Sequence, residues 1–461
     1  MPMAFKDKRV MVLGLGDTGL SALRWLHGRG AVLSVADTRE APPGLQTVRQ
    51  EMPEVRVHLG ALDVAMLAQQ DLLVVSPGVP LAEPAIQQAM AAGVEVVGDV
   101  ELFARARTSG RIIAITGSNG KSTVTSLAGH LCAAAGLDTV VAGNIGLPVL
   151  DALAERERSG RMPDVWVLEL SSFQLETTSS LQADAATVLN ISADHMDRYA
   201  TLDDYAAAKA RILKGCRVQV LNRDDALVMG MARAAAEVQT FGLDAGATPA
   251  ELGLLSHDGR HWLASGHERL FAVEELPLAG LHNAANALAA LALCRAIGLA
   301  DAPLLAALKT FKGLPHRVEF VAEIGGRRFY DDSKGTNVGA TVAALCGFSV
   351  PVVLIAGGDG KGQDFTHMAD AVRQHARAVV LIGRDAPQIS AALQDCDVAV
   401  RHADSMQEAV IQAYDAAETG DVVLLSPACA SFDMFRNYAH RAEVFCAAVH
   451  ALADSRQEVA G

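Results

Sequence analysis

Paired cysteines are missing from this sequence. Its seven cysteines are scattered along the chain, odd in number, and none belongs to a C-x-x-C motif. This pattern excludes a disulfide framework and a cysteine-based zinc site, and it is typical of reduced thiols in a cytosol.

Positive charge is also scarce. The chain has 39 Lys and Arg residues against 53 Asp and Glu residues, which gives a formal net charge of −14. An acidic balance of this kind does not favour a nucleic-acid surface or a surface for anionic membranes. We therefore expect small-molecule partners, and an anionic substrate would need cationic groups gathered in its site.

Long hydrophobic runs are absent as well, although 51% of the residues are apolar. The Ala-rich stretch Ala284–Leu293 is broken by an asparagine and is far shorter than a membrane span. Residues 1–9 are too polar for a signal peptide. We expect no membrane insertion and a cytoplasmic location.

What the chain does contain is a repeated order of short apolar strands and longer helical segments. With 461 residues it exceeds a single core, and the usual domain size suggests about three domains. Strand–turn–helix repetition predicts parallel, doubly wound α/β domains. The pattern restarts at three points, so we expect domains at residues 1–98, 99–313 and 314–461. The expected strands are Val10–Leu13, Leu72–Val75, Ile112–Ile115, Val165–Leu168, Ala186–Leu189, Val352–Ile355, Ala378–Ile382 and Val422–Leu425.

The first motif is a glycine-rich turn, Gly14–Gly19, between an expected strand and an expected helix. It has the form G-x-G-x-x-G, and Asp37 ends the next strand about 20 residues later, as in dinucleotide-binding folds. Its glycines let backbone N–H groups approach a diphosphate at the helix N-terminus. Any ligand that contains a diphosphate satisfies this geometry, so the motif alone leaves an NAD-dependent oxidoreductase as one alternative.

The second motif decides the reaction class. The strand Ile112–Ile115 runs into Thr116–Thr123, with the sequence T-G-S-N-G-K-S-T. This is a phosphate-binding loop, in which backbone amides and Lys121 would hold the β- and γ-phosphates and Ser122 would bind Mg²⁺. It departs from the strict pattern because Ile115 stands at the position of the first glycine. An oxidoreductase has no need of such a loop, so ATP chemistry is the leading interpretation.

Two further groups suit magnesium chemistry. Glu169 follows the buried strand Val165–Leu168, and His195 lies in the segment after Ala186–Leu189. Open α/β sheets place their sites at the carboxyl ends of strands, and a neutral imidazole can bind a metal. We therefore expect both groups to handle metal ions beside the phosphate loop.

Motifs from one end of the chain to the other resemble those of the Mur ligases. The resemblance rests on Gly14–Ser21, Asp37–Arg39, Ser76–Gly78, Gly98–Phe103, Thr116–Thr123, Gly143–Gly146, Glu169–Glu176, Asp194–Tyr199, His282-Asn283, Leu314–Arg317, Asp332–Gly339 and Ser426–Ser431. It implies N- and C-terminal Rossmann-like domains that flank a central phosphate-loop domain with a mainly parallel sheet. The stretches Glu169–Glu176 and Asp332–Asn337 point to the member that adds D-glutamate to UDP-N-acetylmuramoyl-L-alanine.

The resemblance also assigns binding residues. It implies a UDP-substrate site made of Gly14, Gly16, Asp17, Thr18, Asp37, Thr38, Arg39, Gly78, Asn144, Ser171 and Gln174. It implies an ATP site made of Gly117, Ser118, Asn119, Gly120, Lys121, Ser122, Thr123, Asn283, Asn286, Arg317 and Asp332. For the amino acid it implies Lys334, Thr336, Lys361, Ser431, Phe432 and Tyr438.

The catalytic set implied is Lys121, Glu169, His195 and Lys209. Two Mg²⁺ ions would be held by Ser122, Glu169, His195 and Lys209, with Lys209 carbamylated by CO₂ and so carrying a carboxylate-like group. His195 could instead help to deprotonate the incoming amine. Phe432 and Tyr438 stand where the family pattern has Leu and Phe, and Asp17 is an unexpected acid beside a diphosphate.

The activity implied is ATP-dependent amide-bond formation through an acyl phosphate and a tetrahedral intermediate. L-glutamate or another acidic amino acid is the main alternative, because residue types alone do not fix handedness. An oxidoreductase leaves Thr116–Thr123 unexplained, and a non-catalytic nucleotide-binding regulator leaves Glu169, His195 and Lys209 unexplained. A monomer is expected, because one chain contains the whole site.

Overall fold

This computed structural model describes residues 5–234, 236–278 and 280–460. The chain divides into two compact units. Unit 1 comprises Met1–Ile191, Asp203–Phe241 and Ala289–Ala307, and unit 2 comprises Ser192–Leu202, Gly242–Leu288 and Leu308–Gly461. Each unit contains a doubly wound sheet whose strands end at candidate site residues.

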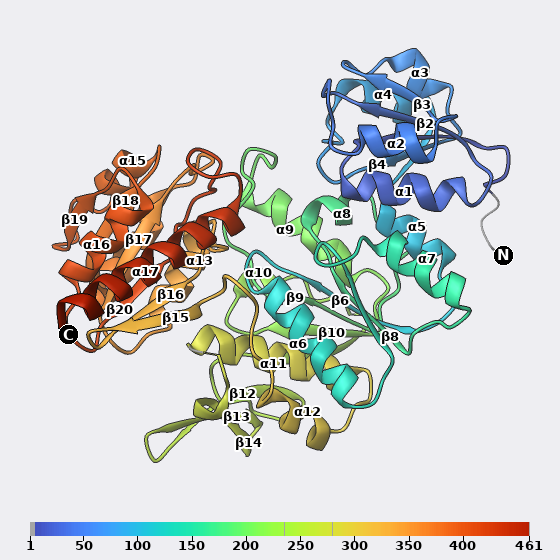
Figure 1. Ribbon diagram of the computed structural model, residues 1–461. Helices are drawn as coiled ribbons and strands as arrows, with labels where there is room; N and C mark the ends of the chain where they lie inside the picture. The colour runs from blue at the N-terminus through green and yellow to red at the C-terminus, as the bar shows by residue number, and fades with distance from the viewer. Residues whose placement is uncertain (1–4, 235, 279, 461) are drawn as a thin grey trace. The chain divides into compact units, whose positions relative to one another are not determined.

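The first sheet of unit 1 is parallel, with the strand order β3-β2-β1-β4-β5 (blue in Figure 1). Val10 and Val12 pack in one apolar cluster and Met11 and Leu13 in another, so both faces of β1 are covered. The order reverses direction between β1 and β4, which is where such folds bind ligands. The elements are β1 (Arg9–Leu13), α1 (Asp17–His27), β2 (Val32–Asp37), α2 (Leu45–Glu51), β3 (Arg56–Leu59), α3 (Val64–Ala68), β4 (Leu72–Val75), α4 (Pro84–Ala91), β5 (Glu95–Val97) and α5 (Asp99–Ala106).

A second parallel array in unit 1 has the order β7-β8-β6-β9-β10-β11. Its central strand β6 leads directly into the phosphate-loop helix α6. The elements are β6 (Arg111–Thr116), α6 (Lys121–Ala134), β7 (Thr139–Gly143), α7 (Val149–Ser159), β8 (Val165–Glu169), α8 (Ser172–Glu176), β9 (Ala185–Val188), α9 (Leu202–Ala210), η1 (Arg211–Leu213), β10 (Val218–Asn222), α10 (Ala226–Met229) and β11 (Glu237–Phe241).

Unit 2 begins its strands with an antiparallel meander that the sequence analysis did not predict. It consists of β12 (Glu251–His257), β13 (Arg260–Ser265) and β14 (Glu268–Ala272). Asp258 and Gly259 join the first two strands with φ values of 51° and 74°, the positive values that a tight hairpin turn requires. After η2 (Val273–Glu275) come the helices α11 (Leu281–Ala296) and α12 (Asp301–Leu308).

The larger sheet of unit 2 has the order β15-β16-β20-β17-β18-β19, with β15 antiparallel and the other strands parallel. Val352 and Leu354 pack on one face and Val353 and Ile355 on the other, so helices cover both sides (orange to red in Figure 1). The elements are β15 (Glu319–Ile324), β16 (Arg327–Asp331), α13 (Val338–Cys346), β17 (Val352–Gly357), η3 (Phe365–Met368), α14 (Ala369–His375), β18 (Ala376–Ile382), α15 (Ala386–Ala392), β19 (Ala399–His402), α16 (Met406–Ala416), β20 (Val422–Leu425) and α17 (Tyr438–Ala460).

The predicted fold class is confirmed: the chain has a three-domain α/β architecture with mostly parallel sheets. All eight predicted strands are present, as β1, β4, β6, β8, β9, β17, β18 and β20. The domain limits at residues 98 and 314 stay a prediction. Within the described ranges, no helix has the length and apolar character needed to cross a bilayer.

Candidate active site

Unit 1 contains a cavity of about 720 Å³ at the glycine-rich turn. Every residue predicted to contact the UDP end lines it, except Ser171. The turn requires glycine at two positions: Gly14 has φ +89°, and a Cβ on Gly19 would lie 1.9 Å from the Gly14 carbonyl oxygen. Backbone N–H groups are therefore exposed to a ligand at the start of α1, as an anionic diphosphate requires.

Asp37 holds this turn in place. Its buried carboxylate accepts a hydrogen bond from the Leu15 N–H at 2.7 Å and pairs with the Arg39 guanidinium at 2.7 Å. The hydrogen bond from Arg39, with the backbone N–H of Leu15, lowers the pKa of Asp37 to about 2. Asp37 is thus ionised at neutral pH, and it fixes the arrangement of the turn relative to the exposed Arg39.

Ser171 and Gln174 lie in the segment that follows β8, at the start of α8. Ser171 caps α8, where it accepts a hydrogen bond from the Gln174 N–H at 3.2 Å, and this cap explains why Ser171 does not line the cavity. The Gln174 amide donates to the buried Asp99 at 3.4 Å. Burial raises the pKa of Asp99 to about 6. The cap and this contact orient Gln174 towards the cavity that it lines.

Sequence reasoning missed two charged residues of this cavity, Arg24 and Asp151. Arg24 lies on α1, nearly two turns beyond Asp17, and Asp151 lies in the first turn of α7. The helical spacing from Asp17 could have indicated Arg24. No local pattern indicates Asp151, because α7 and α1 are brought together only by the fold.

The phosphate loop joins β6 to α6. Ile115, which departs from the strict motif, belongs to β6 and pairs with Glu169 of β8, so the loop proper starts after the strand. Gly120 at the start of α6 has φ +81°, a conformation that favours glycine. Lys121 Nζ donates to the carbonyl oxygens of Gly117 and Ser118 at 2.8 and 3.0 Å.

Asn190, at the end of β9, braces the same loop. Its side-chain oxygen accepts from the Asn119 N–H at 2.8 Å, and its side-chain nitrogen donates to the Asn119 oxygen at 3.2 Å. Its own carbonyl oxygen accepts from the Ser118 N–H at 2.9 Å. Sequence reasoning did not single out Asn190.

Glu169 is the last residue of β8 and is 1% exposed. One carboxylate oxygen accepts from the Asn144 amide at 2.7 Å. The other, Oε2, is buried and has no hydrogen-bond partner among the described residues. A buried carboxylate oxygen of this kind fits a divalent cation. Ser122, the other predicted magnesium ligand of unit 1, is also buried, and its role stays a prediction.

Lys209, on α9, is also 1% exposed. Its ammonium donates to the Gly117 carbonyl oxygen at 2.8 Å and to Thr116 Oγ1 at 3.4 Å, and lies 4.6 Å from the centre of the Tyr205 ring. Lys121 and Lys209 therefore both point to the Gly117 carbonyl oxygen. The fold brings Lys209 to the phosphate loop, and its carbamylation and its role as a metal ligand stay predictions.

His195 belongs to unit 2, whereas Lys121, Glu169 and Lys209 belong to unit 1. That His195 acts in the same catalytic site as those three residues stays a prediction. His195 has φ 58°, and its backbone N–H donates to Asp194 at 3.0 Å. Buried Asp194 also pairs with Lys361 at 3.5 Å and accepts from Asn337 at 3.3 Å. Asp194, which the sequence analysis did not assign, thus ties the His195 segment to the predicted amino-acid residue Lys361.

A second cavity, of about 500 Å³, lies in unit 2 and is lined by Asn283 and Arg317 among the predicted ATP residues. Asn286 and Asp332 do not line it. Asn286 donates to the Asn283 side chain at 3.1 Å, and buried Asp332 accepts from Ser426 at 2.7 Å. Burial raises the pKa of Asp332 to about 7.

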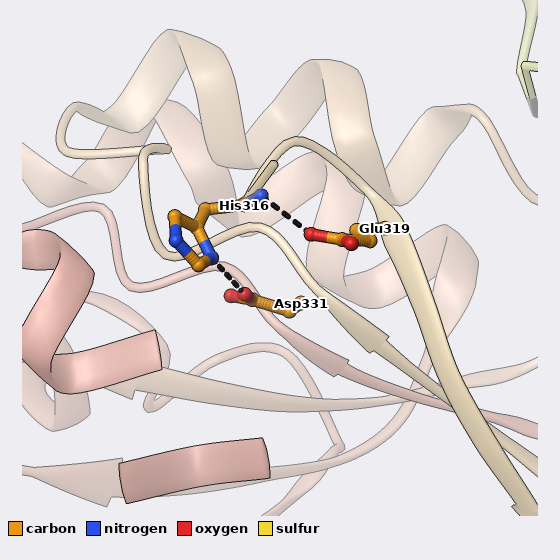
Figure 2. A group of neighbouring side chains, drawn as sticks. All are labelled: His316, Glu319 and Asp331. Atoms are coloured by element: carbon orange, nitrogen blue, oxygen red, sulfur yellow. Dashed lines mark hydrogen bonds and ion pairs between the residues drawn. The ribbon is translucent and has the colours of Figure 1, made fainter. Parts of the chain in front are cut away.

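The segment that carries Arg317 is held by its neighbours (Figure 2). The His316 imidazole meets the buried Asp331 carboxylate at 2.7 Å, and the His316 N–H donates to Glu319 at 2.8 Å. His316 and Val318 have φ values of 64° and 48°, uncommon for such residues. These hydrogen bonds account for the close grouping of His316, Glu319 and Asp331, so no metal is needed to explain it.

The predicted amino-acid residues lie on loops at the carboxyl ends of neighbouring strands in unit 2, except Tyr438, which begins α17. Lys334 Nζ lies 5.3 Å from the centre of the Tyr438 ring, and Ser431 is buried. Phe432 is 73% exposed and Tyr438 is 37% exposed. The structure therefore groups Lys334 with Tyr438, while the Phe432 ring stands out into solvent.

Fold and site together define a multidomain nucleotide-binding enzyme. The chain matches the Mur ligase MurD-like N-terminal domain over residues 8–98, the Mur ligase middle domain over 115–294 and the Mur ligase glutamate ligase domain over 316–429. The chain belongs to the Mur ligase family.

Its relatives include two proteins named UDP-N-acetylmuramoylalanine–D-glutamate ligase. The one from Methylobacillus flagellatus is 61% identical over 97% of this chain and 98% of its own length. The one from Chromobacterium violaceum is 58% identical over 98% of this chain and 100% of its own. Among solved structures, MurF from Acinetobacter baumannii has the same fold, with a TM-score of 0.61, 17% identity, and coverage of 95% of this chain and 93% of that one.

Proposed function

We propose that this Mur ligase joins D-glutamate to UDP-N-acetylmuramoyl-L-alanine, with conversion of ATP to ADP and phosphate, in the synthesis of peptidoglycan precursors. The observation that carries the proposal is the phosphate loop of unit 1, where Lys121, buried Lys209 and the unpartnered Glu169 oxygen converge on one edge of a parallel sheet. Relatives that bear this name match almost the whole chain.

The reaction takes two steps. The L-alanyl carboxylate attacks the γ-phosphorus of ATP, which gives an acyl phosphate and releases ADP. The amine of D-glutamate then attacks the acyl carbon, loses a proton, and the tetrahedral intermediate expels phosphate. Phosphoryl transfer depends on positioning and on neutralised charge. Lys121 and the loop amides supply both, because they lie where β6 opens into α6.

The UDP end of the substrate occupies the cavity at the glycine-rich turn. Its diphosphate faces the N-terminus of α1, and the exposed Thr38 and Arg39 face the uracil. Asn144 and Gln174 hold the sugar and the alanyl arm, since both line the same cavity. Asp17 is exposed and lines this cavity.

ATP is held by the phosphate loop and, at its adenosine end, by Asn283, Asn286, Arg317 and Asp332. D-glutamate is held by Lys334, Thr336, Lys361, Ser431, Phe432 and Tyr438. Cations and hydroxyls are suitable partners for a dicarboxylate, since charge-assisted hydrogen bonds replace its water. The residue types suit L-glutamate as well, so the handedness is decided by the assay below.

Magnesium fits this site by the chemistry of its donors. Ser122 and Glu169 would hold one ion, and His195 with carbamylated Lys209 the other. The ions would neutralise the phosphate oxygens of ATP. Carbamylation joins Lys209 Nζ to the carbon of CO₂ with loss of a proton, and it needs a neutral amine, which burial favours.

Phosphate release by the purified protein tests the function. The assay contains ATP, Mg²⁺ and UDP-N-acetylmuramoyl-L-alanine, with D-glutamate, L-glutamate or no amino acid. We expect release only with D-glutamate and a product heavier by one glutamyl residue. Release with L-glutamate alone would keep the mechanism and reverse the handedness. ATP binding without amino-acid-dependent release would favour a regulator.

Carbamylation has its own test. The intact protein should show an added mass of one CO₂ under native conditions, lost on acidification, and the Lys209→Arg protein should lack it. Activity of the original protein should fall when CO₂ is removed and return with bicarbonate. An unmodified, fully active protein in CO₂-free buffer would refute the carbamate.

We also propose that the protein acts as a monomer in the cytoplasm. Light scattering at assay concentrations tests whether it is a monomer.

A further inference from the structure

Arg441, in the first turn of α17, is 0% exposed. Its guanidinium donates three hydrogen bonds to two loops of unit 2. Nε donates to Ser333 Oγ at 3.0 Å, Nη2 to the Ser333 carbonyl oxygen at 2.8 Å, and Nη1 to the Cys429 carbonyl oxygen at 3.1 Å. No assigned role in catalysis or binding accounts for this side chain.

The two loops that Arg441 joins leave neighbouring strands. β16 and β20 are parallel, with Asp331 opposite Leu425, so residues 332–336 and 426–431 emerge side by side from their carboxyl ends. The first loop carries Lys334 and Thr336, and the second ends at Ser431. Arg441 therefore connects, by hydrogen bonds, the two loops that carry candidate residues of the amino-acid site.

The two loops also contact each other directly. Ser426 Oγ donates to Asp332 at 2.7 Å, and the Ala428 N–H donates to the Gly335 carbonyl oxygen at 3.0 Å. The second loop is held on its other side by Asp359, which exchanges two backbone hydrogen bonds with Ala430 at 2.8 and 2.9 Å. Ser333 extends the Arg441 network, since its hydroxyl donates to the Tyr438 carbonyl oxygen at 2.8 Å. The guanidinium thus also fixes the N-terminus of α17, where Tyr438 faces Lys334.

Arg441 is a costly residue in this position. It makes no ion pair with any carboxylate among the described residues, and burial lowers the pKa of its guanidinium to about 10, which leaves it charged at neutral pH. Taking a guanidinium out of water is unfavourable even when it is hydrogen-bonded, and the nearby acidic groups of Asp331, Asp332 and Asp433 offset only part of that penalty. A hydrophobic residue could fill the space between α17 and the sheet without this cost. It could not form the hydrogen bonds that join the loops 332–336 and 426–431 to α17.

We propose that Arg441 is a positioning residue that sets the spacing of the two loops and so selects the length of the dicarboxylic amino acid. The inference rests on the proposed function, because it takes Lys334, Thr336 and Ser431 as the groups that hold the substrate. Glutamate and aspartate differ by one methylene, so a site with fixed spacing accepts the former and leaves a polar group of the latter unpaired. A site with loosened loops discriminates less.

The test compares Arg441→Met, Arg441→Lys and Ser333→Ala with the original protein in the phosphate-release assay. We expect Arg441→Met to raise KM for D-glutamate about tenfold and to narrow the ratio of kcat/KM for D-glutamate over D-aspartate about tenfold, the scale of one methylene. Arg441→Lys and Ser333→Ala should give smaller changes in the same direction, because an ammonium cannot reproduce the planar set of donors. KM for ATP should change less than KM for D-glutamate in all three, because the Asp332 carboxylate keeps its hydrogen bond from Ser426.

Phe445→Leu is the matched control. Phe445 lies one turn further along α17, is 0% exposed and packs in an apolar cluster of unit 2 that, among the described residues, includes no member of the two loops. Lost stability alone lowers the active fraction, so this variant should lower kcat for both amino acids and leave KM and their ratio unchanged.

Two results separate the possible failures. An active original protein, with an unchanged ratio and unchanged KM for D-glutamate in Arg441→Lys and Ser333→Ala, would overturn the inference and make Arg441 purely structural. If Arg441→Met does not fold, Arg441→Lys and Ser333→Ala still test whether Arg441 positions the loops. An original protein without amino-acid-dependent phosphate release would overturn the proposed function, and the inference with it.

Discussion

At the scale of single residues, burial and hydrogen-bond partners shift the pKa values of two aspartates in opposite directions. Asp37 is buried but meets Arg39 and a backbone N–H, so its carboxylate is held ionised and its pKa falls to about 2. Asp332 is buried with a hydroxyl as its direct partner, and burial raises its pKa to about 7. The same residue type is thus a fixed charge in unit 1 and a titrating group near neutral pH in unit 2.

Asp332→Asn should change how stability depends on pH. The pKa in the folded state lies above the ordinary aspartate value of 3.8, so the native state binds more protons than the unfolded state between about pH 4 and pH 7. Stability of the original protein should therefore fall over this window, by up to about 1.4 kcal/mol per pH unit relative to the variant, and level off above it. Urea unfolding across this range measures it, with exposed Asp415→Asn as the control. Parallel curves would mean that Asp332 is ionised throughout.

Asp37→Asn should behave in the opposite sense. The depressed pKa contributes stability that is complete above the ordinary aspartate pKa of 3.8 and is lost as the pH falls towards about 2. We expect the variant to be less stable by about 1–2 kcal/mol near neutral pH, discounted because Arg39 is exposed, with the difference shrinking below about pH 4. Affinity for the UDP substrate, measured by calorimetry, should fall as well. Unchanged affinity would separate Asp37 from the site.

At the scale of elements, the ends of parallel strands carry almost every candidate residue. β1, β6, β8, β9, β16 and β20 each end in a loop that holds a binding group or braces one. The braces come from elsewhere in the fold: Asn190 supports the phosphate loop, and Arg441 supports the two loops of unit 2. Positioning therefore depends on pairs of loops rather than on single motifs.

Asn190→Ala tests whether a bracing side chain positions the phosphate loop. Loss of both side-chain hydrogen bonds to Asn119 frees the loop backbone, so KM for ATP should rise about tenfold while KM for D-glutamate stays unchanged. Asn222→Ala is the matched control, since the Asn222 side chain is hydrogen-bonded to Leu189 and Asp224 rather than to the loop. Equal effects of the two variants on KM for ATP would exclude a specific role for Asn190.

At the scale of the whole molecule, the candidate ligand sites divide between the two compact units. The UDP-substrate cavity is lined only by residues of unit 1, and the candidate amino-acid residues all belong to unit 2. The chain has a net charge of −14, so its anionic ligands depend on local cations and helix termini.

Hydrogen exchange should reveal this division. UDP-N-acetylmuramoyl-L-alanine alone, at about 100 times its dissociation constant, stabilises the state that binds it by about 2.7 kcal/mol. We expect the strongest slowing of exchange at the start of α1 and at residues 37–39, with little change at residues 332–336 and 426–431. Protection confined to unit 2 would contradict the assignment of the cavity. The free protein with UDP-glucose serves as the control for the diphosphate alone.

Much of this could be predicted from the sequence. The eight strong strands are continuous apolar runs, and buried parallel strands produce that pattern directly. The β12–β14 meander was missed because its turns, such as Asp258-Gly259, are short and its strands are only partly buried. Most residues predicted to bind the UDP end do line one cavity, because they lie on short loops after strands. Ser171 does not, since it caps a helix.

The sequence by itself determined the fold class, the phosphate loop and the kinds of side chain available to an anionic substrate, because each depends on neighbours within a few residues. Only the tertiary structure decided that Asp151 faces the UDP-substrate cavity, that Lys209 reaches the phosphate loop 92 residues away, and that Arg441 ties two loops together. These contacts join segments far apart in the chain. Their formation depends on which strands pair and which helices pack between them, and no local pattern of residues records that choice.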